Sequence, residues 1–202
     1  MWTPLFSIFA VIVSITIVFK KFPADYSEIR YASFAALAAW LIGDIVISVN
    51  APAQDFLHLA LQSTSLSLVL VIFLQFIRQR KPIIFRYPYY MVFVPLLIPI
   101  AQLIVMEAQI IREIIFMSLQ GVAIFVYVLI SFGYSEELHY KLLTIVGVLL
   151  LIWGFAFFWI LQEYYIVFDW AWGLTNTGGL IACIYSFSDL LETIETTQPV
   201  TQ

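Results

Sequence analysis

The lysine and arginine residues of this 202-residue chain lie almost entirely in alternate connections between long apolar runs. Eight of the nine follow the first, third or fifth run, namely Lys20, Lys21, Arg30, Arg78, Arg80, Lys81, Arg86 and Lys141. Only Arg112 lies in one of the connections that follow the even-numbered runs. Because membrane proteins keep Lys and Arg in cytoplasmic loops, this alternation predicts the orientation of every span. We expect the N-terminus outside and the C-terminus in the cytoplasm.

Seven apolar runs account for most of the chain. The hydrocarbon core of a bilayer is about 30 Å thick, and a helix needs roughly 20 apolar residues to cross it. The expected spans lie near residues 4–19, 31–49, 56–77, 83–105, 110–132, 142–161 and 170–190. The content of charged residues, 11%, is less than half of the roughly 25% that soluble domains carry. The sequence therefore predicts an all-α, polytopic membrane protein, with one seven-helix transmembrane domain at residues 1–190 and a short, polar, frayed cytoplasmic tail at residues 191–202.

The first run is expected to stay in the protein as a helix. Basic residues follow it rather than precede it, and no small-residue cleavage site comes before them, so it differs from a cleaved signal peptide. The compact chain and the lack of targeting signals make the bacterial inner membrane the expected location.

Three of the runs carry features that predict how their helices bend and pack. Pro95 and Pro99 fall inside the fourth run, which we expect to form a bent helix, because a proline removes a backbone hydrogen bond. Small residues recur at intervals of four in the second and seventh runs, at Ala35, Ala39 and Gly43 and at Gly178, Ala182 and Ser186. Such stripes let helix backbones approach closely, so both helices should be packed inside the bundle.

Strongly polar side chains within the spans are concentrated toward the outer face under this orientation. The candidates for a binding site are Asp44, Gln62, Gln102, Gln120 and Asn176, and Asp44 is the only deep acid among them. Polar groups are costly in a bilayer and tend to face the bundle interior or water. We therefore predict a polar pocket that opens outward, with Asp44 shielded from lipid and paired with a residue such as Gln62 or Asn176. For each amide taken alone, the favoured interpretation is a hydrogen-bonding link between helices.

Several functional classes are disfavoured by what the sequence lacks. Cys183 is the only cysteine, and His58 and His139, expected at an interface or in a loop, fall on opposite sides of the membrane, so no metal site is expected. No lysine in the seventh run could hold retinal, no paired histidines could hold haem, and no cofactor is expected. No basic cluster suggests nucleic acid. Hydrolase, protease and phosphate-loop motifs are missing as well.

Two short stretches resemble an enzyme family. The Leu-Ile-Gly-Asp run at residues 41–44 resembles the Gly-Asp helix of the YhhN-type lysoplasmalogenases, integral membrane hydrolases that act on lysoplasmalogens. The Ser-Asp pair at residues 188–189 is similar to the later Ser-Asp motif of that family. The resemblance implies a lipid hydrolase with Asp44 and Asp189 as catalytic candidates. The chain departs from the family pattern at residues 63–68, where His and Tyr are expected, and the predicted orientation puts the two acids at opposite depths.

The leading hypothesis is a non-enzymatic, sensor-like or receptor-like seven-helix protein with a polar ligand- or partner-binding pocket in its outer half. Its partners would be the lipid bilayer, a small-molecule or lipid ligand, and a separate membrane protein that carries the signal. The alternatives are the membrane-embedded lipid hydrolase and an accessory subunit that docks its small-residue helices on a larger membrane complex. Two exposed small-residue stripes would favour the accessory subunit.

Overall fold

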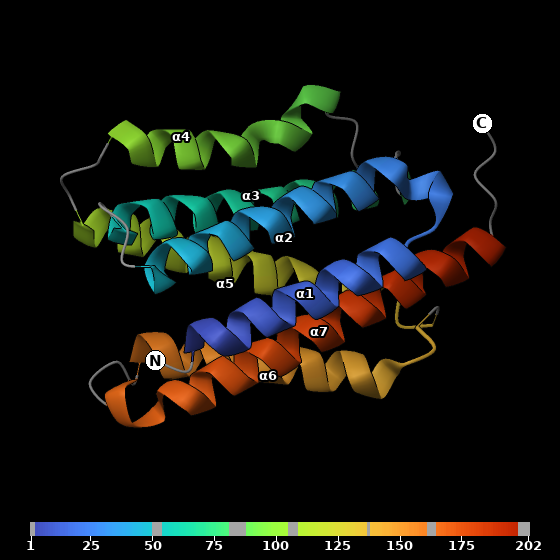
Figure 1. Ribbon diagram of the computed structural model, residues 1–202. Helices are drawn as coiled ribbons and strands as arrows, with labels where there is room; N and C mark the ends of the chain where they lie inside the picture. Colours follow the sequence, from blue (N-terminus) through green and yellow to red (C-terminus); the bar gives the residue numbers. More distant parts are fainter. Residues whose placement is uncertain are drawn as a thin grey trace. The chain divides into compact units, whose positions relative to one another are not determined.

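The computed structural model describes residues 3–49, 54–80, 88–104, 109–136, 138–160 and 165–197, and every regular element in these ranges is helical (Figure 1). The α-helices are α1 (Thr3–Lys21), α2 (Ser27–Ser48), α3 (Gln54–Arg80), α4 (Leu97–Ile104), α5 (Gln109–Gly133), α6 (Lys141–Ile160) and α7 (Tyr165–Thr197). Two 3₁₀ helices, η1 (Ala24–Tyr26) and η2 (Tyr89–Leu96), precede α2 and α4. The predicted all-α class is confirmed.

Long apolar helices with exposed apolar faces indicate a membrane protein. Four stretches in the described part of the chain are long and apolar enough to cross a membrane, namely Ala24–Val46, Phe56–Arg80, Gln109–Gly133 and Lys141–Ile160. On α6, the exposed side chains of Leu142, Ile145, Leu149 and Ile152 recur at helical spacing and form an apolar stripe along one face. A stripe of this kind would be costly in water and is typical of a surface that faces lipid.

The fourth apolar run departs from the bent α-helix predicted for residues 83–105. Residues 89–96 form the 3₁₀ helix η2, and the α-helix α4 begins only at Leu97. Pro88 precedes η2 and Pro95 lies within it. Because proline has no backbone N–H, it cannot close the hydrogen-bonded turns of an α-helix, and the tighter 3₁₀ turns take their place. The prediction of one α-helix is wrong here, and residues 83–87 and 105 lie outside the described residues.

At the other end of the chain, α7 is longer than the sequence predicts. The expected end is Leu190, whereas the helix continues to Thr197. Leu191 and Ile194 are buried on this extension. Residues three apart share a face of a helix, so the extension has an apolar side whose burial stabilises it. The prediction of a frayed tail is therefore wrong for residues 191–197, and residues 198–202 lie outside the described part.

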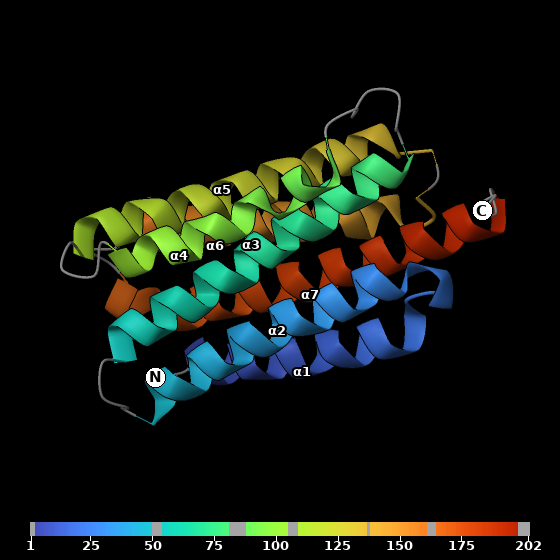
Figure 2. The same cartoon turned by 90° about the horizontal axis from the view of Figure 1, so that it is seen from above.

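The helices form two compact units. Unit 1 (Met1–Arg30 and Ser131–Gln202) contains α1, α6 and α7, and α7 packs against both of the other helices. Unit 2 (Tyr31–Ile130) contains α3, η2 and α4 together with most of α2 and α5. In unit 2, α3 packs against η2 and α4, which run beside it in the opposite direction (Figure 1, Figure 2).

Small residues bring α6 and α7 close together in unit 1. A Cβ atom placed on Gly147 of α6 would lie 2.9 Å from Cβ of Ala182 and 3.0 Å from Sγ of Cys183. Any residue larger than glycine would have to push α7 away at this point, so the predicted packing of the seventh-run stripe is confirmed. The second-run stripe is packed only in part, because Gly43 is buried and Ala35 is exposed.

Candidate functional site

One end of unit 2 carries most of the polar side chains of the predicted site. Helices α2 and α4 end there and α3 and α5 begin there, because successive helices run in opposite directions (Figure 1). This chain path places five polar residues toward the same end, which we call the polar end of unit 2. They are Asp44 of α2, His58 and Gln62 of α3, Gln102 of α4 and Arg112 of α5.

Asp44 and Gln62 meet where α2 packs on α3. The Asp44 side chain is only 3% exposed, and Gln62 is also buried. Nε2 of Gln62 donates a hydrogen bond of 3.4 Å to Oδ1 of Asp44. The bond is longer than the usual 2.7–3.2 Å, roughly, so it contributes weakly, but it gives a buried carboxyl group a donor. The expected shielding of Asp44 is confirmed, and its partner is one of the two that the sequence suggested.

His58 joins the same helix contact. Its Nδ1 atom lies 3.1 Å from the backbone oxygen of Gly43 and donates to it in the tautomer that carries the proton on Nδ1. A Cβ atom placed on Gly43 would lie 3.4 Å from Cβ of Leu61 and 3.6 Å from Nδ1 of His58, which are ordinary contact distances. The sequence suggested an interfacial or loop histidine without a role in the site. The signal that points to its position is the spacing of four residues between His58 and Gln62, which puts both on one face of α3.

The other three predicted site residues are placed differently. Gln102 is 1% exposed, and neither polar atom of its amide has a hydrogen-bond partner in the described part of the chain. Gln120 is half-buried on α5. Asn176 belongs to unit 1, where its Oδ1 would lie 2.5 Å from a Cβ atom placed on Gly154 of α6. Of the five predicted residues, the structure therefore joins Asp44 with Gln62.

Arg112 is a buried cation that sequence reasoning left out of the site. Its side chain is 9% exposed, and its guanidinium carbon lies 5.3 Å from the centroid of the Phe56 ring on α3. Its Nε atom has no hydrogen-bond partner among the described residues. The sequence feature that points to Arg112 is its isolation, because it is the one basic residue outside the connections expected in the cytoplasm.

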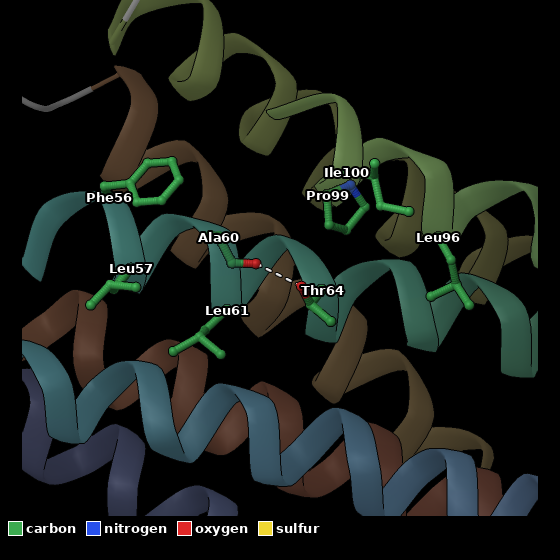
Figure 3. A pocket seen from close by; sticks show the side chains of 8 residues that line it. All are labelled: Phe56, Leu57, Ala60, Leu61, Thr64, Leu96, Pro99 and Ile100. Carbon is green, nitrogen blue, oxygen red and sulfur yellow. Dashed lines mark hydrogen bonds between the residues drawn. The ribbon is translucent and has the colours of Figure 1, made fainter. Parts of the chain in front are cut away.

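A pocket lies beside the polar end, between α3 and the η2–α4 segment. Its volume is about 340 Å³, and Figure 3 shows the eight side chains that line it: Phe56, Leu57, Ala60, Leu61, Thr64, Leu96, Pro99 and Ile100. The hydroxyl group of Thr64 donates a 2.8 Å hydrogen bond to the backbone oxygen of Ala60, so the walls offer no free side-chain donor. None of the five predicted site residues lines this pocket.

Unit 1 holds a separate polar cluster at the end where α7 terminates. Nδ1 of His139 lies 3.9 Å from Oδ2 of Asp189 and 2.9 Å from the hydroxyl oxygen of Thr193. Asp189 is buried and His139 is exposed. The sequence predicts that His139 lies at an interface or in a loop, and it does not predict a contact with Asp189. The contact with Thr193 depends on the length of α7, because Thr193 lies beyond the predicted end of that helix.

A lysine–tyrosine contact lies in the same unit. Nζ of Lys21, at the end of α1, donates a 2.6 Å hydrogen bond to the hydroxyl oxygen of Tyr185. This bond raises the pKa of Lys21 above its usual 10.5. The ring of Tyr140 packs edge-on against Tyr185 at 5.7 Å between centroids.

The comparisons with known proteins add no relative. No protein-family model, no curated protein and no solved structure matches the chain. The resemblance to lysoplasmalogenases rests on the short stretches at residues 41–44 and 188–189 alone. Within the described residues there is also no group of three or more His, Cys, Asp and Glu side chains that could hold a metal ion.

Proposed function

We propose that this chain is a non-enzymatic, seven-span membrane protein that binds a small polar ligand at the polar end of unit 2. In this proposal the N-terminus and the polar end face outward, and the C-terminus faces the cytoplasm. The protein acts as a sensor or receptor and passes its signal to a separate membrane protein. We infer the bacterial inner membrane as its location.

The observation that carries the proposal is the buried Asp44–Gln62 pair, with His58 beside it, inside the α2–α3 contact. An ionisable side chain is costly inside a membrane protein and is found chiefly where it serves a function. The three side chains supply an acid, an amide and an imidazole, which together accept and donate hydrogen bonds. This set suits a small ligand with hydrogen-bond donors or a positive charge, such as an amine or amino acid.

A thermal-shift measurement on the purified protein in lipid nanodiscs tests the proposal. The probes are a panel of small amines, amino acids and organic cations. We expect at least one to stabilise the wild type, since a ligand at 100 times its Kd adds about 2.7 kcal/mol to the free energy of unfolding. Asp44→Asn should remove this gain, whereas Asp25→Asn, at an exposed acid in unit 1, should keep it. Equal stabilisation of both variants, or of neither the wild type nor the variants, would contradict the proposal.

One observation favours the lipid hydrolase as the second candidate. The contact between His139 and Asp189 pairs an imidazole with a carboxyl group, which is a common acid–base arrangement in hydrolases. Asp44, the other catalytic candidate, contacts Gln62 in the other unit. Release of aldehyde from a lysoplasmalogen by the purified protein, lost in Asp44→Asn and in Asp189→Asn, would establish this activity.

The accessory-subunit hypothesis finds less support in the structure. Two exposed stripes of small residues would favour it, but Ala182 and Cys183 of the α7 stripe are buried against Gly147 of α6. In α2 only one part of the stripe, at Ala35, is exposed. A dock on a larger complex would therefore have to use other surfaces.

A further inference from the structure

We propose that the pocket between α3 and the η2–α4 segment binds a long-chain fatty acid, with the part of the acyl chain nearest the carboxylate inside the pocket and the carboxylate against Arg112. This site shares the polar end of unit 2 through Arg112 and Gln102, but its walls include neither Asp44 nor Gln62. The tests of the two proposals use different residues and different probes, so either proposal can fail without the other.

The walls of the pocket suit an acyl chain. Phe56 and Leu96 stand at its two ends, with Pro99 and Ile100 between them on the α4 side (Figure 3). From Phe56 to Thr64 the pocket follows α3 for about 12 Å, at 1.5 Å per residue. Because the Thr64 hydroxyl is already bonded within α3, the guest gains dispersion contacts and loses no hydrogen bond along this length.

The Phe56 end of the pocket supplies the charge. Arg112 covers the Phe56 ring at 5.3 Å, is more than nine-tenths buried, and leaves its Nε atom without a hydrogen-bond partner among the described residues. The acid next to it in the chain, Glu113, accepts a 2.8 Å hydrogen bond from Gln109. A buried guanidinium group is costly unless an acceptor compensates its charge, and a carboxylate can accept two parallel hydrogen bonds from it.

A second donor lies on α4 beyond the pocket wall, although it does not itself line the pocket. Gln102 follows Pro99 by three residues, so the two share a face of α4. Its amide is buried and has no hydrogen-bond partner in the described ranges. The carboxylate of a bound fatty acid can accept a hydrogen bond from this amide, which would satisfy a group that otherwise stays unpaired.

The size and position of the pocket favour one chain with an anionic head. A volume of about 340 Å³ lies at the lower end of the range for small-molecule sites, and it has room for one acyl chain rather than the two of a phospholipid. Phe56 lies near the start of α3, where a long apolar helix reaches the membrane surface. The carboxylate would stay at the depth of the lipid headgroups while the chain follows α3 inward.

Photocrosslinking tests the site directly. The full-length protein in phosphatidylcholine nanodiscs is irradiated with a diazirine derivative of palmitic acid, and the crosslinked peptides are identified by mass spectrometry. We expect crosslinks in residues 56–64 and 96–100, competed by palmitate but at least roughly tenfold less well by hexadecanol, because the alcohol lacks the charge-assisted bond to Arg112. Phosphatidylglycerol, with two chains, should compete as poorly as hexadecanol.

Variants separate the charge from the cavity. Arg112→Gln should weaken competition by palmitate roughly tenfold and leave that by hexadecanol unchanged, and Arg112→Lys should recover part of the loss. Ala60→Phe should block both competitors by filling the pocket. Arg78→Gln is the matched control, because Arg78 lies 5.1 Å from the ring of Tyr89 at the opposite end of α3. Unchanged palmitate affinity in Arg112→Gln and in Ala60→Phe, or equal competition by palmitate, hexadecanol and phosphatidylglycerol, would overturn the proposal.

Discussion

Asp44 and Gln62 face each other across the α2–α3 contact, and His58 lies on the same face of α3 as Gln62. Hydrogen bonds between transmembrane helices contribute little each, about 0.6 kcal/mol on average, because the unfolded chain in the membrane finds other partners. The Asp44–Gln62 bond therefore cannot be what holds α2 on α3. Its value lies in keeping a carboxyl group inside the helix contact, where a ligand can use it.

Substitution of Asp44 tests how much the Asp44–Gln62 hydrogen bond contributes to the free energy of unfolding. Asp44→Ala should lower the free energy of unfolding by roughly 1 kcal/mol, because the buried amide of Gln62 loses its acceptor. Asp44→Asn keeps an acceptor oxygen in place and should cost less than half as much. The free energy is measured by denaturant titration in mixed micelles. In the Gln62→Leu background, Asp44→Ala and Asp44→Asn should lower the free energy of unfolding by the same amount. If Asp44→Ala still costs more than Asp44→Asn there, Asp44 acts through a contact other than Gln62.

At the scale of the elements, the α6–α7 pair shows how small residues set helix spacing. Gly147 lies against Ala182 and Cys183, and α7 packs on α1 as well. In a bilayer, apolar side chains gain nothing by leaving lipid, so close backbone approach and dispersion supply much of the packing energy. The buried part of α7 is therefore sensitive to the volume of single residues on α6.

Two glycine substitutions form a matched test of this packing. Gly147→Ala should lower the free energy of unfolding by about 1–3 kcal/mol, because its Cβ atom would crowd both the Ala182 side chain and the backbone of Cys183. Gly133→Ala, at the end of α5, should be neutral or slightly stabilising, since no atom lies within 4 Å of the new Cβ position. Both variants are compared by thermal unfolding in one detergent. Equal effects at the two positions would contradict the described packing.

The sequence predicts helix positions better than helix contacts. Apolar run length predicts where helices form, so the predicted all-α class is confirmed. The length of an apolar run does not say how a helix is turned about its own axis, and this orientation decides that Arg112 is buried against Phe56. The 3₁₀ turns of η2 need the local effect of Pro95. The composition of the last residues predicts a polar tail. The spacing of three between Leu191 and Ile194 indicates instead that α7 continues with an apolar face.

At the scale of the whole molecule, the proposed orientation connects the sites to the membrane. Four helical stretches in the described part can cross a bilayer, and α3 runs from the polar end, near His58, to the basic residues Arg78 and Arg80. If the basic end of α3 lies in the cytoplasm, the polar end of unit 2 faces outward. The polar-ligand proposal depends on this orientation, because its ligand has to arrive from outside. The fatty-acid pocket does not depend on it.

Cysteine labelling of intact cells is the most direct test of this central claim. Val49→Cys, at the exposed residue that follows α2, and Gln79→Cys, at the exposed end of α3, are made in a Cys183→Ala background. A membrane-impermeant maleimide is added outside, and labelling is compared before and after the cells are opened. We predict that Val49→Cys reacts in intact cells and that Gln79→Cys reacts only after opening. Reaction of Gln79→Cys in intact cells, with Val49→Cys protected until opening, would contradict the orientation and the outward-facing site.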